Sequence, residues 1–259
     1  PEAELEVISG VTEQQLRALD AYLEQVQVQI IESTANCPFD IQVTAHAGND
    51  TAYARIIGHH TNVVSVKKND NVLVDVPFQD DVVQAPENRK LLSVENIVKF
   101  ADEVKIEDVQ EVLQRQIDYN MAIAQAGMDG SYGATIGKIL LKSYGNCIQN
   151  RAKAWAAAGS DARMCGCELP VVINSGSGNQ GMTASIPVIV YAREMGMTQD
   201  ALYRALVVSN LVTIHLKTGI GSLSAYCGAT SAGCGAGAGI CYLYGGRFYQ
   251  ISHTIVNAL

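Results

Sequence analysis

The spacing of the hydrophobic positions changes along the chain and separates two kinds of structure. From Val11 to Glu32, apolar residues recur every three or four positions, which predicts a helix with one buried face; they are Leu16, Leu19, Leu23, Val26 and Ile30. After Pro38 the pattern predicts short strands rich in Val, Ile and Thr, over residues 40–45, 52–58, 63–66 and 72–76. The polar run Lys67–Asn71 between the last two predicts a hairpin turn.

From Ser93 onward the spacing is helical. Helices are predicted over residues 93–104, 107–126, 133–142 and 147–158, from residue 180 onward, and over 198–216 and 222–244. Pro86-Glu-Asn-Arg disfavours both kinds of element, and the period changes across it, so it is the predicted linker. The predicted fold class is α+β. A small α+β domain over residues 1–88 precedes an all-helical domain over residues 89–259, which has a central buried helix rich in Gly, Ala and Cys.

Composition narrows the class of protein. The chain has 259 residues, 48% of them hydrophobic, which indicates a soluble globular protein. A net charge of −8 without a dense basic run argues against nucleic acid as a partner. Seven cysteines, none in a CxxC pair, favour a reducing cytoplasm over secretion. The opening residues after Pro1 are acidic and carry no export signal, and we interpret them as the cut edge of a longer protein.

A Gly-rich loop is the first candidate binding site. Residues 169–181 place an apolar run before a small polar loop, and a helix is predicted to begin near Met182. Backbone N–H groups at such a helix start can hold a carboxylate or a phosphate, and four side chains add further polar groups: Asn174, Ser175, Ser177 and Asn179. The spacing matches neither a Walker loop nor GxGxxG. An ordinary helix-capping loop is the alternative interpretation, near parity with the first.

Three cysteines follow the predicted helix Ser222–Tyr244 at intervals of seven. Cys227, Cys234 and Cys241 share one stripe, but consecutive thiols are separated by about 10 Å of helical rise. At most one of them can therefore be a ligand of a small metal cluster. The stretch from Thr218 to Gly246 is uncharged and contains GxxxG pairs, so a membrane span is an alternative. Its many small and polar residues favour a buried helix of a soluble bundle.

Other polar residues are candidates with a structural alternative. In Gly58–Asn62, neighbouring histidines on a strand point to opposite faces, so one of them, His59, is assigned to a site. Arg163 precedes the Gly-rich loop and suits a carboxylate, although an exposed ion pair is the simpler reading. His215 and Lys217 end an apolar helix, where a buried, hydrogen-bonded role is more usual than a catalytic one.

Four strings together resemble one enzyme family. They are Ser160-Asp-Ala-Arg-Met, Asn174-Ser-Gly-Ser-Gly-Asn-Gln-Gly-Met-Thr, Leu223-Ser-Ala-Tyr-Cys-Gly-Ala-Thr-Ser-Ala-Gly-Cys, and Gly58-His-His-Thr-Asn, the last similar to a GGHTN stretch. In this order they resemble the L-serine dehydratase alpha-chain and L-cysteine desulfidase family, from about Val11 to the last residue.

The resemblance implies a lyase with a [4Fe–4S] cluster. Such an enzyme eliminates sulfide from L-cysteine, or water from L-serine, and releases pyruvate and ammonia. Three thiolates would hold the cluster, with Cys227 matching the first of them. A small amino acid is the implied partner, and its site would include Asn174, Ser175, Ser177, Asn179, Arg163 and His59.

Two family motifs are absent from this chain. One is an upstream Gly-Cys-Thr-Glu-Pro motif that supplies the presumed base, and the other is a downstream Cys-Asp-Gly-Ala…Cys motif that supplies two cluster ligands. We therefore expect a fragment without an intact cluster or activity, and the catalytic residues stay unassigned. A buried Gly-rich helix and low charge favour a homodimer.

Three alternatives use the same residues differently. A pyridoxal-phosphate eliminase would need Lys138 or Lys217 as its Schiff-base lysine, and neither lies in a convincing motif. A non-catalytic member of the fold would only bind a small amino acid or assemble with another chain. A membrane protein would be built around Ser222–Tyr244.

Overall fold

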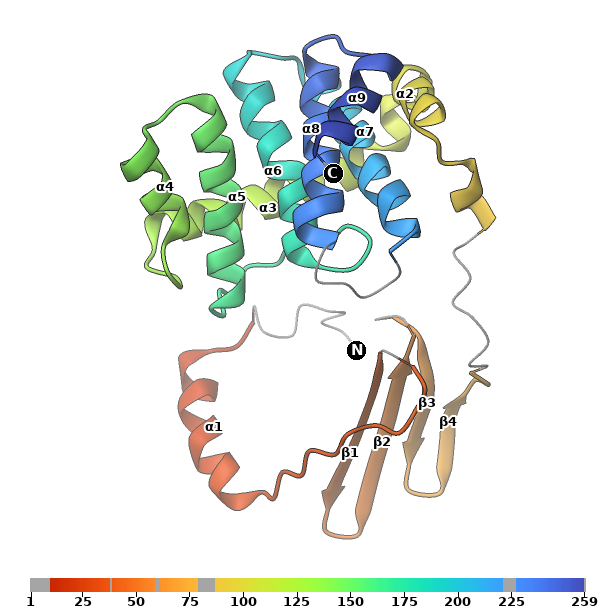
Figure 1. Cartoon of the computed structure of the whole chain (residues 1–259). Coiled ribbons are helices and arrows are strands. Elements are labelled where there is room, and N and C mark those ends of the chain that lie inside the picture. The colour runs from red at the N-terminus through yellow and green to blue at the C-terminus, as the bar shows by residue number, and fades with distance from the viewer. Residues whose placement is uncertain (1–9, 38, 59–60, 79–86, 221–226, 259) are drawn as a thin grey trace. The chain divides into compact units, whose positions relative to one another are not determined.

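The computed structural model describes residues 10–37, 39–58, 61–78, 87–220 and 227–258. Its residues cluster into two compact units, one within residues 12–85 and the other within residues 86–259. The first unit contains an antiparallel sheet and the second is helical, which confirms the α+β class. Figure 1 shows the elements of both units.

The sheet is a meander of four antiparallel strands in sequence order. They are β1 (Asp40–Ala47), β2 (Asp50–Ile57), β3 (Val63–Lys68) and β4 (Asn71–Asp75). The predicted hairpin turn is confirmed, with Asn69 in the left-handed region at φ 52°. Asn69 also accepts a hydrogen bond from the Thr51 N–H at 2.7 Å, so the β3–β4 turn is tied to the start of β2. Asparagine tolerates this backbone conformation better than most residues.

Helix α1 (Glu13–Gln25) is shorter and more exposed than its pattern predicts. A capping box between Thr12 and Gln15 starts it. It ends at Gln25, since Val26 is extended at φ −113° and ψ 141°, and β-branched residues follow at alternate positions, where their side chains disfavour helix. No residue of α1 is buried among the described residues, so the prediction of a buried face is wrong.

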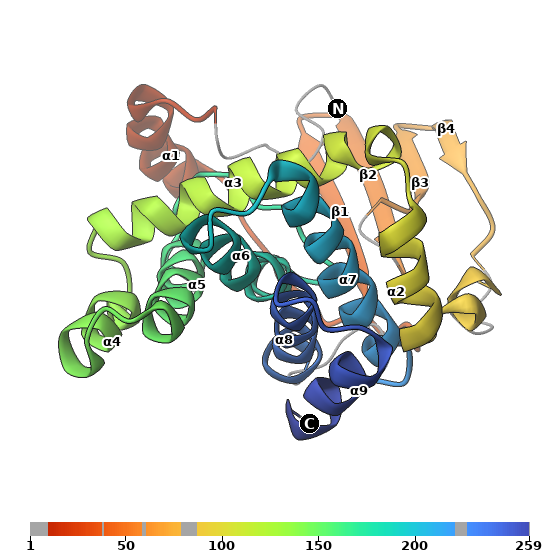
Figure 2. The ribbon, with the colours of Figure 1, turned by 90° about the horizontal axis from the view of Figure 1, so that it is seen from above.

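The second unit is a helical bundle. Its helices are α2 (Val94–Glu103), α3 (Gln110–Asp129), α4 (Ile136–Tyr144), α5 (Ile148–Met164), α6 (Gly178–Glu194), α7 (Gln199–Thr218), α8 (Ala232–Leu243) and α9 (Phe248–Ala258). Short 3₁₀ turns cover Glu87–Leu91 and Ile106–Asp108, and the π-helical turn η3 covers Cys227–Ser231. Figure 2 shows α3 lying across α5, α6 and α7, which it contacts. The sequence-based predictions omit α9, although Ile251 and Ile255 are buried on one face of it.

Helix α8 packs against α6, α7 and α9, most closely against α7. A Cβ atom at Gly235 would lie 2.5 Å from the carbonyl oxygen of Ser209, and one at Gly239 would lie 2.9 Å from that of Ala205. This GxxxG pair therefore serves helix packing inside the unit. The predicted helix over residues 222–244 is confirmed as an α-helix from Ala232 to Leu243. Cys227–Ser231 form a π-helical turn before it, and residues 222–226 lie outside the described residues.

The membrane alternative finds no support in the helices that the structure describes. None of them combines the length and the hydropathy that crossing a bilayer requires.

Candidate functional site

The Gly-rich loop connects α5 to α6 and is shaped by its first turn. Helix α5 ends at Cys165, Gly166 adopts the left-handed region at φ +83°, and the Cys167 N–H donates to the Ala162 carbonyl at 2.9 Å. This is a Schellman arrangement, which glycine favours because it has no Cβ. The chain then runs extended through Val171 toward α6.

Asn120 of α3 holds this extended segment. Its side chain is fully buried, accepts from the Val172 N–H at 2.9 Å and donates to the Val172 carbonyl at 3.2 Å. It also donates to the Ser185 hydroxyl at 3.0 Å, and Ser185 donates to the Gly181 carbonyl at 2.8 Å. A Cβ at Gly181 would lie 2.1 Å from the Val172 oxygen, so glycine is required where loop and helix meet.

A second amide network fixes the beginning of the loop. Gln116 and Asn210 exchange hydrogen bonds of 3.0 and 2.8 Å between α3 and α7. Asn174 donates to the Asn210 side chain at 2.7 Å, and its own side-chain oxygen accepts from the Ser175 N–H at 2.7 Å. Asn174 is buried, so its predicted role in substrate binding is accompanied by a clear role in shaping the loop.

The first turn of α6 brings together three of the predicted residues. Ser177 is the N-cap, and its hydroxyl accepts from the Gln180 N–H at 3.2 Å. Arg163, at the end of α5, donates to the Asn179 side-chain oxygen at 3.2 Å. A Cβ at Gly178 would lie 2.5 Å from Arg163 Nε, so the guanidinium group lies directly against the helix start. The arrangement concentrates positive charge and N–H donors at the N-terminus of α6.

Lys217 approaches the same loop from the end of α7. Its side chain is 2% exposed, and its ammonium group donates to the Ser175 carbonyl. The Gln180 amide donates to the Ser175 hydroxyl at 3.2 Å. Figure 1 shows the start of α6, the end of α7 and the start of α8 at one end of the helical unit. Lys217, a weak candidate by sequence, therefore belongs to the loop's surroundings.

Two of the predicted site residues are described only in part or not at all. His59 lies outside the described residues. Cys227 begins η3, which contacts α6 and α7, but its side chain is not among those the structure describes. The backbone of the proposed cluster ligand thus belongs to the same end of the helical unit as the Gly-rich loop.

The described thiols do not fit an iron–sulfur cluster. Among the described residues, no three His, Cys, Asp or Glu side chains gather to hold a metal. Cys234 is fully buried against the Ile255 carbonyl at 3.9 Å, and burial raises the pKa of its thiol, which disfavours the thiolate that a metal needs. Cys241 packs against Gly246, where an added Cβ would lie 2.4 Å from the Cys241 sulfur.

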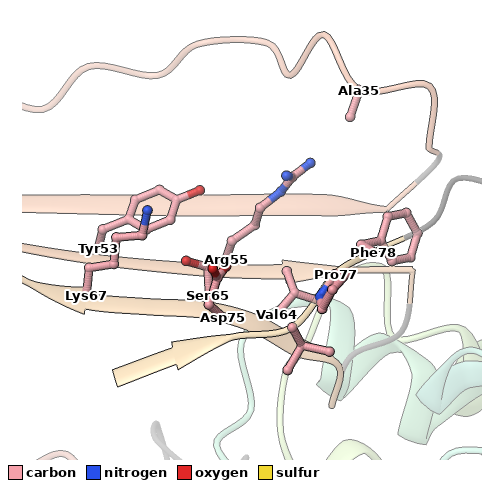
Figure 3. A pocket seen from close by; sticks show the side chains of 10 residues that line it. Ala35, Tyr53, Arg55, Val64, Ser65, Lys67, Asp75, Pro77 and Phe78 are labelled. Atoms are coloured by element: carbon pink, nitrogen blue, oxygen red, sulfur yellow. The ribbon is translucent and has the colours of Figure 1, made fainter. Parts of the chain in front are cut away.

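The sheet carries a separate polar pocket of about 580 Å³ (Figure 3). Tyr53, Arg55, Ser65, Lys67 and Asp75 line it from β2, β3 and β4, with Ala35, Val64, Val76, Pro77 and Phe78 at its apolar side. Alternation along antiparallel strands places these polar side chains on one face of the sheet. None of them is a residue that the sequence analysis assigns to a site.

An ion pair on this sheet predicts acid sensitivity. Arg55 Nε lies 2.8 Å from Asp40 Oδ1, and its hydrogen bond lowers the pKa of Asp40 to about 2. Because the folded pKa lies below the usual value near 4, stability from this pair is present above pH 4 and is lost between pH 4 and 2. The unfolding temperature of the sheet unit should fall between pH 4 and pH 2 in the wild type, and it should fall less in Asp40→Asn. An unchanged slope in the variant would contradict this.

The sequence analysis does not assign four amide side chains around the loop to the site. Gln116, Asn120 and Gln180 are buried, and Asn210 is partly buried. A signal for two of them exists, because Gln116 and Asn120 are four residues apart on the stripe of α3 that also buries Leu113 and Ile117. Polar residues on a buried stripe need partners, which the spacing cannot identify.

The comparisons with known proteins give the family. The family model of the serine dehydratase alpha chain matches residues 2–259. A UPF0597 protein of Desulfitobacterium hafniense, DSY1109, is 54% identical over 98% of this chain and 59% of its own length. UPF0597 proteins of Treponema denticola and Lachnoclostridium phytofermentans are 43% and 44% identical, each over 98% of this chain and 61% of their own length. No solved structure matches.

The chain spans about three fifths of the length of the curated relatives it matches. The family match nevertheless covers both the sheet unit and the helical unit, and it includes the Gly-rich loop and η3. This chain therefore belongs to the serine dehydratase alpha chain family.

Proposed function

We propose that this chain supplies the substrate-binding part of a β-eliminating lyase that converts L-cysteine or L-serine to pyruvate and ammonia. Family membership supports the reaction class. The observation that carries the proposal is the meeting of two cations and a helix N-terminus at one Gly-rich loop. Arg163 reaches the first turn of α6, and the Lys217 ammonium group reaches the Ser175 carbonyl.

This arrangement suits the carboxylate of an amino acid. N–H groups of a helix start and a guanidinium group both favour a negative charge, and the partly buried setting strengthens that interaction because water screens it less. We assign carboxylate binding to the start of α6 with Arg163 and Asn179. Arg163 Nη1 lies 3.2 Å from Asn179 Oδ1. Asn174, Ser175 and Ser177 shape the loop so that these groups face the ligand.

Holding the carboxylate would orient the rest of the substrate. β-Elimination removes the α-proton and expels sulfide or water from the β-carbon, and the resulting enamine hydrolyses to pyruvate and ammonia. A fixed carboxylate holds Cα in place, and a further contact at the β-substituent would then set the Cα–Cβ torsion that elimination needs. The chain's described residues orient the substrate in this proposal, and the base that takes the proton stays unassigned.

We propose a [4Fe–4S] cluster as the cofactor of the full-length protein, in the cytoplasm, with Cys227 as one ligand. The cluster would supply a Lewis acid for the leaving group. Cys234 and Cys241 are poor further ligands because the helical rise separates them from Cys227 and from each other, and Cys234 is buried with a raised thiol pKa. The remaining thiolates would have to come from elsewhere, so we expect the 259-residue chain alone to be inactive.

Pyruvate release tests the proposal. The full-length gene product, reconstituted anaerobically with iron and sulfide, should form pyruvate from L-cysteine or L-serine, and Cys227→Ala should abolish this. Arg163→Met should raise KM by about 10- to 100-fold, the effect of losing a hydrogen bond to a charged group. Arg151→Met is the matched control on α5, because Arg151 pairs with Glu194 at the surface and should leave KM unchanged.

The outcomes separate the proposal from its alternatives. Pyruvate formation by the full-length protein, with KM sensitive to Arg163 but not to Arg151, supports it. A loaded cluster without pyruvate from either amino acid would contradict it and would favour a member of the fold that only binds or assembles.

A further inference from the structure

Two buried polar atoms stand out in the helical unit. Among the described residues, Gln180 Oε1 and Ser231 Oγ are the buried side-chain atoms without a hydrogen-bond partner, and both side chains belong to residues that are 0% exposed. Leaving a buried polar atom unpaired costs about 1–3 kcal/mol, so native proteins rarely do so without a reason. A ligand that supplies the missing partner is such a reason.

Both atoms belong to elements that contact each other. Gln180 lies in the first turn of α6, and Ser231 ends η3, which contacts α6 and α7. The remaining amide atom of Gln180, Nε2, donates to the Ser175 hydroxyl at 3.2 Å. Ser175 is the residue whose carbonyl accepts from Lys217. The unpaired oxygen of Gln180 is therefore held next to the loop that we assign to the substrate.

We propose that Gln180 Oε1 accepts a hydrogen bond from the α-ammonium group of the amino-acid ligand, with the hydroxyl of Ser231, on a turn that contacts α6, as a second acceptor. An amide oxygen can only accept, so its missing partner must be a donor. The ammonium group offers three N–H donors, and a hydrogen bond to a charged group is stronger than a neutral one. This inference rests on the proposed function, because it takes the ligand to be an amino acid.

The charges nearby restrict the ligand further. The α6 N-terminus, Arg163 and Lys217 all repel a lone cation and favour an anion. The site therefore needs a negative charge for these cationic groups and a donor for Gln180. A zwitterion supplies both, because its carboxylate faces the cationic groups while its ammonium group reaches Gln180. The site should therefore distinguish amino acids from simple carboxylic acids by means of Gln180.

Two unreactive probes isolate the ammonium group. L-Alanine and propanoate share the carboxylate and the methyl group, and only L-alanine carries the α-ammonium group. Calorimetry on the full-length protein gives Kd for each probe, and the ratio of Kd for propanoate to Kd for L-alanine measures the selectivity. The ratio is insensitive to a general loss of affinity or stability, which would weaken both probes.

Substitutions at Gln180 should change this ratio. Gln180→Met removes the acceptor at similar volume and should lower the ratio by about 10- to 100-fold. Gln180→Glu keeps an acceptor oxygen and should not lower it. Gln114→Met is the matched control, because the Gln114 amide on α3 pairs with Asp118, Gln199 and Tyr203 and takes no part in the hydrogen bonds of the loop. Its ratio should stay within about threefold of the wild type.

The possible results decide each proposal separately. An unchanged ratio in Gln180→Met, or an equal fall in Gln180→Glu, would overturn the role of Gln180, as would a wild-type protein that does not bind L-alanine. Pyruvate release with an unchanged ratio would leave the lyase standing without this inference. If the ratio falls as expected but the protein releases no pyruvate, the role of Gln180 in binding stands and the lyase proposal fails.

Discussion

Gly235→Ala is expected to destabilise the protein by about 3 kcal/mol. Its new Cβ would lie 2.1 Å from Thr213 Oγ1 and 2.5 Å from the Ser209 carbonyl oxygen. Both distances are far inside van der Waals contact, and the second atom belongs to the backbone of α7, so the two helices must separate. Because α7 and α8 pack extensively against each other in the helical unit, the loss should appear as a lower midpoint in denaturant-induced unfolding.

Gly233→Ala in the same helix is the matched control. No described atom lies within 4 Å of a Cβ at Gly233. Alanine should therefore stabilise α8 by up to about 1 kcal/mol, since glycine loses more backbone entropy on folding. Similar unfolding midpoints for the two variants would mean that Gly235 does not face α7 as the structure places it.

Asn120→Ala is expected to cost about 3 kcal/mol and to loosen the Gly-rich loop. The substitution removes three hydrogen bonds, two to the Val172 backbone and one to the Ser185 hydroxyl, and leaves their partners in a buried position. Since Val172 leads into the loop, the proposed function also predicts a higher KM in the full-length protein. Unfolding curves and pyruvate kinetics measure the two effects.

Gln125→Ala provides the comparison for Asn120. Gln125 lies on the same helix and donates to Asp129 at 2.9 Å, but at an exposed position. Its loss should change stability by less than about 0.5 kcal/mol. If both variants lost the same small amount, water would have to replace the buried hydrogen bonds of Asn120 without penalty.

Local pattern was sufficient for most elements. The period of two and the polar run before Asn71 predict the strands and the β3–β4 turn, because each depends on residues close in the sequence. Caps at Ser93 and Thr198 likewise lie at the predicted helix starts. Helix α6 begins at Gly178, ahead of its predicted start. Burial was less predictable. The stripe of α1 matches a core helix, yet Leu19 and Leu23 are 47% and 49% exposed in the described chain.

The Gly-rich loop could be predicted from the sequence only in part. Its glycines and small polar residues indicate an anion site before a helix, and the structure places Arg163 beside it. The sequence could not show that Asn174 pairs with Asn210, or that Gln180 keeps an unpaired oxygen. These facts depend on which side chains of α3 and α7 reach the loop.

The sequence by itself determined the α+β class, the positions of the strands, most helices and the family resemblance, because periodicity, caps and motifs are local properties. The tertiary structure decided which polar residues shape the loop, that Lys217 is buried beside Ser175, and which glycines let α7 and α8 approach closely. Packing and hydrogen-bond partners join residues distant in the chain, so they follow only from how the helices cross.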